Sequence, residues 1–291
     1  MKSTSVPVIS VVILSIGLNS VGAEDAHDDL PDPLGLNLTD GWLEPTAHSH
    51  FSRRGTPMIH SFRVEPAFTR RDLLVDYSFS RKRGEKEHEI EAELEWAFTR
   101  RLGLVVELPY AAINPNDEEA VNGCGDLAVS PRFLLAEYER FLLAFALEVE
   151  TPTGSTRGDL GSGEVALAPS VSTWIDLGHW WAANTQCGVE HALESNDSEL
   201  FFRASLIHTL ASHAAHDHAH GLPPGLLSLI LEVDTALALS GADDGDIEAE
   251  GIAGLYYGFS EHADLRLGYV FPLSTSQDLY SGLTAGLLWH F

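Results

Sequence analysis

The sequence predicts an all-β fold, a transmembrane, antiparallel, up-and-down β-barrel of about 12 strands. Three observations predict it. The C-terminal stretch 280–291 alternates between apolar and small or polar residues, as a strand does when its two faces meet different media. The same alternation recurs in segments close to the roughly 9–11 residues that a tilted membrane-spanning strand needs. The connections between those segments alternate between long and short, which is typical of outer-membrane barrels.

The C-terminal stretch gives the clearest pattern. One parity holds mainly small or polar residues, and the other holds Leu283, Ala285, Leu287, Trp289 and Phe291. Aromatic residues end the apolar face, as expected where a strand meets the lipid headgroups. A C-terminal Phe resembles the signal that the barrel assembly machinery reads, so this machinery is an expected partner during insertion. The last strand of a soluble β domain can also end this way.

The chain divides into three parts. Residues 1–23 are expected to form a cleaved signal peptide, with Lys2 as its basic region before an apolar core and a small-residue cleavage site. Residues 24–68 are polar and rich in Pro, Asp and His, and we expect a periplasmic, partly disordered segment. Residues 69–291 are expected to form the outer-membrane barrel. No later apolar run is long enough to cross a bilayer as a helix.

Alternation predicts each strand in turn. The expected strands are 73–79, 89–98, 104–110, 126–135, 141–149, 165–175, 181–190, 200–209, 227–237, 247–257, 264–271 and 280–291. The second of these, taken alone, also fits a helix, because Glu, Leu and Ala are good helix formers. A strand is favoured because every apolar residue between Glu89 and Trp96 falls on an even position, which no helix requires.

The connections alternate in length. With the N-terminus in the periplasm, the longer ones lie outside the cell, at 80–88, 111–125, 151–163, 193–198, 240–245 and 274–279. The tight ones lie at 100–103, 139–140, 176–179 and 260–262. One connection breaks the rule, because 211–225 is long and His-rich but falls on the periplasmic side.

The chain is strongly acidic, with a formal net charge of −26. This charge argues against nucleic acid as a partner, because phosphates need a basic surface. Acidic loops suit the outside of a Gram-negative cell, where bridging divalent cations are abundant. The charge itself says little about the fold.

The parity opposite the apolar one carries nearly all of the charge of the strands. These candidate lumen and selectivity residues are Glu93, Glu95, Glu107, Arg132, Glu148, Arg203, Glu232, Asp234, Glu250 and Arg266. An acidic ring near a constriction would favour cations and repel anions. Alternatively, the same residues form salt bridges that simply fill a small barrel. Alternation alone does not say which face is inside, since in a soluble sandwich the apolar face would be buried between two sheets.

A second candidate site is the histidine cluster in the long connection. His213, His216, His218 and His220 lie two or three positions apart, and imidazoles so spaced can bind Zn²⁺, Cu²⁺ or Ni²⁺. The spacing matches no closed structural zinc site. A solvated low-complexity loop is the alternative. No other cofactor is expected.

The sequence gives no catalytic signature. A nucleophile needs a base beside it on the same face, but Ser205 and His208 fall on opposite parities. His290 is a candidate base on the inner parity, without an adjacent Ser. The glycines lack the strand-to-helix context of a phosphate or dinucleotide site. We therefore expect no enzyme.

Several glycine-containing motifs occur in a specific order. Gly123-Cys-Gly-Asp-Leu127 is followed by Val149-Glu-Thr-Pro-Thr-Gly154, Asp159-Leu-Gly-Ser-Gly163, Gly251-Ile-Ala-Gly254 and Leu267-Gly-Tyr-Val-Phe-Pro-Leu273. Over roughly residues 100–291 this order resembles the outer-membrane transporter family named for the meta pathway of phenol degradation. The resemblance implies a barrel and the passage of small organic molecules, but it supplies no defined substrate. The His-rich connection departs from the family pattern.

Together these patterns predict a channel in the outer membrane of a Gram-negative cell. Small solutes, with hydrophobic or aromatic compounds as candidates, would cross it passively, and outer-membrane lipid would surround it. Two alternatives stay open, a closed structural barrel and a metal-binding outer-membrane protein that uses the His-rich loop.

Overall fold

The computed structural model describes residues 32–46, 49–116, 119–158, 160–211, 222, 224–241, 244–275 and 278–291. The expected signal peptide, 1–23, and most of the His-rich connection lie outside these residues. Thirteen β-strands run through the described part. No helix in this part is long and apolar enough to cross a membrane.

The strands follow the alternating segments of the sequence and are longer than expected at most ends. Their bounds are β1 Arg71–Lys82, β2 Glu85–Ala97, β3 Leu102–Pro115, β4 Val121–Cys124, β5 Leu127–Tyr138, β6 Phe141–Thr151, β7 Ala166–Gly178, β8 Trp181–Ala192, β9 Ser198–Ala211, β10 Leu227–Ala238, β11 Ile247–Ser260, β12 Ala263–Pro272 and β13 Leu279–His290.

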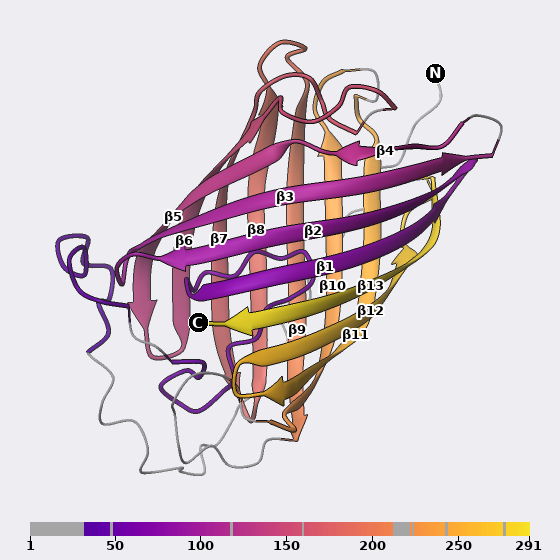
Figure 1. Cartoon of the computed structure of the whole chain (residues 1–291). Helices are drawn as coiled ribbons and strands as arrows, with labels where there is room; N and C mark the ends of the chain where they lie inside the picture. Colours follow the sequence, from indigo (N-terminus) through magenta and orange to yellow (C-terminus); the bar gives the residue numbers. More distant parts are fainter. Residues whose placement is uncertain are drawn as a thin grey trace, which may run out of the picture.

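Twelve of these strands close into an antiparallel barrel, as predicted (Figure 1). Each strand pairs with its neighbour in sequence, except that β4 is a short strand paired only with the far half of β3, so β3 pairs with β5. The first strand, β1, pairs with the last, β13, with Leu73 opposite Trp289. This pairing closes the ring of twelve strands, so their backbone groups are satisfied within the wall, which lipid cannot do.

The two faces of the wall divide as the sequence predicts. On the outer face, large apolar side chains are exposed, among them Leu255, Tyr257, Leu265, Leu267, Tyr269, Leu283, Leu287 and Trp289. On the inner face lie the charged and small residues, together with large apolar residues near the end where β1 begins, such as Leu74 and Trp174. A soluble sandwich would bury the apolar face. The exposed apolar belt with aromatic residues at its rim is instead the surface that lipid requires.

The barrel has two unlike ends. At the end where β1 begins and β13 finishes, which we call the turn end, the connections 139–140, 179–180 and 261–262 are tight. The opposite end, which we call the loop end, carries the longer connections 152–165, 239–246 and 273–278. One expected long connection is absent, because β1 and β2 extend until only Arg83 and Gly84 join them. Gly84 has a φ of 88°, which favours glycine in this tight turn.

The N-terminal segment differs most from expectation. We expected 24–68 to be a periplasmic, partly disordered segment, but residues 49–70 contact side chains of the inner wall. We call these residues the plug. Ser52 bonds to Asp176 of β7, and Val64 bonds to Glu232 of β10. The plug has no helical or strand periodicity, so its burial depends on the barrel around it.

Candidate functional site in the barrel lumen

The plug and the wall form an apolar layer at the turn end. From the plug come Phe51, Ile59, Ala67 and Phe68, and from the wall come Leu74, Ala144, Trp174, Ala182, Ile207, Ile230, Tyr256 and Leu288, with Leu222 and Leu226 from the β9–β10 connection. Trp174 is 1% exposed and Ile59 is fully buried. These inward apolar side chains sit at the turn-end halves of their strands, where they line the part of the lumen that the plug fills.

Carboxylates of the wall anchor the plug on both sides of this layer. Asp176 accepts hydrogen bonds from Ser52 Oγ at 2.7 Å and Thr56 Oγ1 at 2.9 Å. Deeper in the lumen, Glu232 accepts three backbone N–H groups of the plug, from Phe62, Arg63 and Val64, at 2.9, 2.7 and 3.0 Å. A buried carboxylate that receives several N–H groups is well satisfied. Glu232 therefore acts as a specific anchor for the plug.

Phe62 of the plug lies against a part of the wall that only glycine can form. A Cβ atom at Gly254 of β11 would lie 2.5 Å from Phe62 Cε2, and one at Gly268 of β12 would lie 3.0 Å from Phe62 Cζ. The Arg266 guanidinium lies 5.8 Å from the centre of the Phe62 ring, on the same wall. Small residues at these inward positions therefore make room for the plug.

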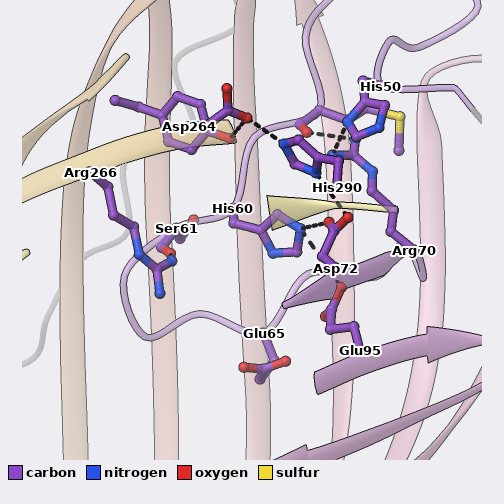
Figure 2. Close-up of polar contacts among 12 residues, drawn as sticks. His50, His60, Ser61, Glu65, Arg70, Asp72, Glu95, Asp264, Arg266 and His290 are labelled. Carbon is purple, nitrogen blue, oxygen red and sulfur yellow. Dashed lines mark hydrogen bonds and ion pairs between the residues drawn. The ribbon is translucent and has the colours of Figure 1, made fainter. Parts of the chain in front are cut away.

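A chain of buried polar groups links the plug to β1 and β13, the first and the last strand of the barrel (Figure 2). Asp72 of β1 lies 3.1 Å from His60 Nε2 of the plug and 2.9 Å from His290 Nδ1 of β13. His290 Nε2 lies 2.5 Å from Asp264 of β12, which also accepts the Tyr256 hydroxyl at 2.6 Å. With a carboxylate at each ring nitrogen, His290 satisfies both as the doubly protonated imidazolium.

His60 is in a different state from His290. Burial lowers the pKa of His60 from 6.5 to about 4, although the hydrogen bond and the charge of Asp72 oppose this shift. The nearby guanidinium groups of Arg70 and Arg266 lower the pKa further. His60 is therefore a neutral imidazole at physiological pH.

Beyond the plug, toward the loop end, the lumen holds an acidic cavity of about 530 Å³. Eleven carboxylate side chains line it, against four cationic ones, Arg63, Lys82, Arg203 and Arg266. All four cations form ion pairs, for example Arg63 with Glu250 at 2.6 Å and Arg266 with Asp76 at 2.5 Å. Several carboxylates form no ion pair with the described residues, namely Glu89, Glu91, Glu93, Glu107, Glu148 and Glu190. The cavity therefore keeps an excess of negative groups.

The ten predicted lumen residues separate into two groups. Seven line the acidic cavity, namely Glu93, Glu107, Glu148, Arg203, Asp234, Glu250 and Arg266. The other three, Glu95, Arg132 and Glu232, lie deeper in the lumen. Arg132 Nη1 lies 2.5 Å from Glu95 Oε1, and Glu232 accepts hydrogen bonds from the backbone of the plug. The lumen therefore contains both arrangements considered from the sequence. Salt bridges fill one part of it, and carboxylates without an ion pair line another.

The first three of the five glycine motifs meet at the loop end around Asp126. Its carboxylate accepts the backbone N–H groups of Gly154 and Ser162, each at 2.6 Å, and the Ser162 hydroxyl at 2.8 Å. A Cβ atom at Gly154 would lie 2.5 Å from the carbonyl carbon of Gly125, so these backbones pack too closely for any side chain. The spacing of the motifs therefore reflects one folded loop cluster.

Sequence patterns did not find His60 or Asp72 as site residues, and they found His290 only as a possible base without a partner. The sequence did contain one signal for a plug. Leu74, Trp174 and Ile230 are apolar residues on the inner parity, and an open aqueous lumen does not require apolar residues there. The histidines predicted to bind metal, His213, His216, His218 and His220, lie outside the described residues.

The closed barrel with an apolar outer face defines the class of protein, an outer-membrane β-barrel. The structure is similar to the COG4313 outer membrane channel from Pseudomonas putida F1, with a TM-score of 0.58 and 15% sequence identity, over 80% of this chain and 100% of that one. At this identity the likeness shows a shared fold.

Two further solved structures resemble the chain more weakly. The NanC porin has a TM-score of 0.49 at 11% identity, over 75% of this chain and 98% of that one. The KdgM porin has the same score and identity, over 75% of this chain and 99% of that one. No protein-family model matches the sequence. A search of curated proteins finds no significant match either. The proposed kinship with the phenol meta-pathway family therefore rests on the motif order alone.

Proposed function

We propose that this protein is a passive outer-membrane channel for small solutes that favours cations over anions. The observation that carries the proposal is the cavity of about 530 Å³ with its excess of carboxylates. In an enclosed site of low dielectric, unpaired negative groups attract cations and repel anions. In this proposal the turn end faces the periplasm and the loop end faces outward.

The plug sets the resistance of the path. Solute would gather in the acidic cavity, then pass the plug near Phe62 and Arg63, which line that cavity. Anchors such as Glu232 hold the plug by hydrogen bonds to its backbone. Passage therefore requires that the plug shift or that solute slip beside it.

The residues that line the cavity indicate which class of solute fits it. Family resemblance suggests hydrophobic or aromatic compounds, whereas most residues around the cavity are charged. The aromatic rings of Phe62 and Phe201 also line it. We infer that small cations, including organic cations with an apolar part, fit this lining better than neutral hydrophobic compounds.

Planar-bilayer recordings of the purified protein test this proposal. Under a KCl gradient the reversal potential should show cation selectivity. The double substitution Glu107→Gln and Glu148→Gln should move that potential toward zero, because it removes two unpaired carboxylates from the cavity. Glu261→Gln, at an exposed turn-end connection, is the matched control and should change nothing. Unchanged selectivity in the double variant would refute the acidic cavity as the selective element.

The apolar layer at the turn end favours a second candidate, a closed structural barrel. Ser61 Oγ of the plug lies 2.5 Å from Ser205 Oγ of β9, so a pair of cysteines at these positions can form a disulfide. In a chain with Cys124→Ser and Cys187→Ser, oxidation of Ser61→Cys with Ser205→Cys would lock the plug. A channel loses conductance on oxidation and regains it on reduction. A closed barrel conducts in neither state.

A further inference from the structure

Three side chains from three separate segments converge at one buried point in the lumen (Figure 2). His60 comes from the plug, Asp72 from β1 and Glu95 from β2. Asp72 and Glu95 lie directly opposite each other in the register of the two strands. Their side chains are 1% and 2% exposed, and that of His60 is 3% exposed. Two buried carboxylates face to face on neighbouring strands repel each other unless a positive group lies between them.

The distances within this group fit a metal site as well as a hydrogen bond from His60 to Asp72. His60 Nε2 lies 3.1 Å from Asp72 Oδ2 and 3.7 Å from Glu95 Oε2. One ligand atom from each of the three residues lies within 4.8 Å of those from the other two. Tetrahedral Zn²⁺ with ligand bonds of about 2.0–2.2 Å places its ligands roughly 3.3–3.6 Å apart. A charge-assisted N–H···O bond is shorter, at about 2.7–2.9 Å.

One atom of the group is left unsatisfied. His60 Nε2 can donate to one oxygen at a time, and Asp72 is the nearer acceptor. Glu95 Oε2 is buried, points at the same nitrogen, and accepts no hydrogen bond from the described residues. A buried carboxylate oxygen without a partner costs free energy. A cation between the three atoms would satisfy both carboxylates and the imidazole lone pair together.

The outer contacts already hold each ligand in place. The second oxygen of Asp72 faces His290 Nδ1 at 2.9 Å, and the second oxygen of Glu95 faces Arg132 Nη1 at 2.5 Å. Contacts of this kind orient ligands and tune the affinity of metal sites.

We propose that His60, Asp72 and Glu95 bind a divalent transition metal of the Zn²⁺ class, which fastens the plug to the barrel wall. One nitrogen and two oxygen ligands suit Zn²⁺, and a fourth position stays open for water. The site uses none of the four histidines of the His-rich connection. Its metal affinity does not depend on conductance, so the site and the proposed channel function can fail independently.

The test measures metal binding by the full-length protein after the histidines of the His-rich connection have been replaced. In a background with His213, His216, His218 and His220 replaced by Ala, the chain is refolded in detergent with Zn²⁺, dialysed, and analysed for bound zinc. We expect one equivalent of zinc per chain. Co²⁺ in place of Zn²⁺ should give the visible absorption of a low-symmetry, four- or five-coordinate site.

Variants then assign the ligands. Glu95→Gln keeps the shape of the side chain and should weaken zinc binding on the order of 100-fold or more, since even loss of an outer contact costs about 10–100-fold. His60→Ala should do the same. Glu91→Gln, on the same strand and facing the same lumen, is the control and should bind as the background does. The gel mobility of unheated samples verifies that each variant folds.

Two results would overturn the assignment. One is a folded background chain that holds no zinc after refolding with it. The other is a folded Glu95→Gln chain that binds zinc as tightly as the background. If His60→Ala does not fold, Glu95→Gln alone decides, because it removes one charge without removing volume.

Discussion

The backbone N–H of Arg63 donates a 2.7 Å hydrogen bond to the carboxylate of Glu232, a residue 169 positions further along the chain. Neither residue belongs to a local motif. The contact exists because the barrel closes around the plug and brings β10 against it. Predictions about the plug therefore follow from wall residues as well as from the plug itself.

The first prediction concerns this anchor. Glu232→Gln replaces one of two accepting oxygens with an NH₂ group that faces backbone N–H donors. We expect the free energy of unfolding to fall by about 1.5–3 kcal/mol, the value of a hydrogen bond to a charged group. Urea unfolding, followed by the gel mobility of unheated protein, measures it. Glu248→Gln, on the exposed part of β11, should leave the midpoint unchanged; an equal shift there would mean a general charge effect.

The second prediction tests the packing of Phe62 on the wall. Gly254→Ala puts a Cβ atom within 2.5 Å of the Phe62 ring and should destabilise the protein by about 1–3 kcal/mol. In a Phe62→Ala background the same substitution should cost little, because the colliding ring is gone. Thermal unfolding of the four chains in one double-mutant cycle gives the coupling energy. Additive effects would show that Phe62 does not pack on Gly254.

The third prediction concerns the loop cluster at Asp126. Asp126→Asn weakens the bonds from Gly154 and Ser162, so the 152–165 connection should open more often. Tryptic cleavage after the exposed Arg157 should become roughly 10-fold faster or more. Asp278→Asn, at an exposed ion pair in another loop-end connection, should leave the rate as it is. Equal acceleration in both variants would contradict a specific role for Asp126.

The same cluster should respond to acid. Burial tends to raise the pKa of Asp126, but hydrogen bonds from Gly154 and Ser162 lower it below 3.8. A lowered pKa in the folded state contributes stability above the unfolded value, and this contribution is lost as pH falls through the folded value. Cleavage after Arg157 by an acid-stable protease of suitable specificity, or amide exchange at Gly154, should therefore speed up only below about pH 4. Acceleration already near pH 6 would point to another group.

The last prediction tests the orientation of the barrel. Cys124 is exposed on β4 at the loop end, whereas Cys187 is exposed on the lipid-facing side of β8. A membrane-impermeant maleimide should label Cys124 in intact cells that carry Cys187→Ser. Cells that carry Cys124→Ser, and so retain only Cys187, serve as the control and should stay unlabelled. Labelling of Cys124 only after the outer membrane is permeabilised would reverse the proposed orientation.

The division of the wall residues between the two faces could largely be predicted from the sequence. The parity of β13 and β12 placed Leu287 and Leu267 outside and Arg266 inside, and the structure agrees. The plug could not be read this way. Residues 49–70 have no period, and segments rich in Pro and polar residues are usually solvated. Their burial comes from apolar wall residues such as Trp174. The parity of Trp174 follows from the sequence, but the segment that covers it is decided only by the tertiary structure.

The candidate metal site shows the same limit. His60, Asp72 and Glu95 are spread over 36 positions of the sequence, in no spacing that a metal motif uses. Their convergence requires β1 and β2 to pair in one register, with Asp72 opposite Glu95, and requires the plug to turn into the barrel. A shift of one residue would turn every side chain of a strand to its other face.

The sequence by itself determined the class of fold and the two media that the wall separates, because alternation along a strand is a local property of the backbone. It also placed most of the charges of the strands on the face opposite the apolar one. Only the tertiary structure decided that a segment from before the first strand fills the turn end, and which wall residues hold it. Those contacts join positions far apart in the chain, and they exist only after β1 pairs with β13 and the barrel encloses a lumen.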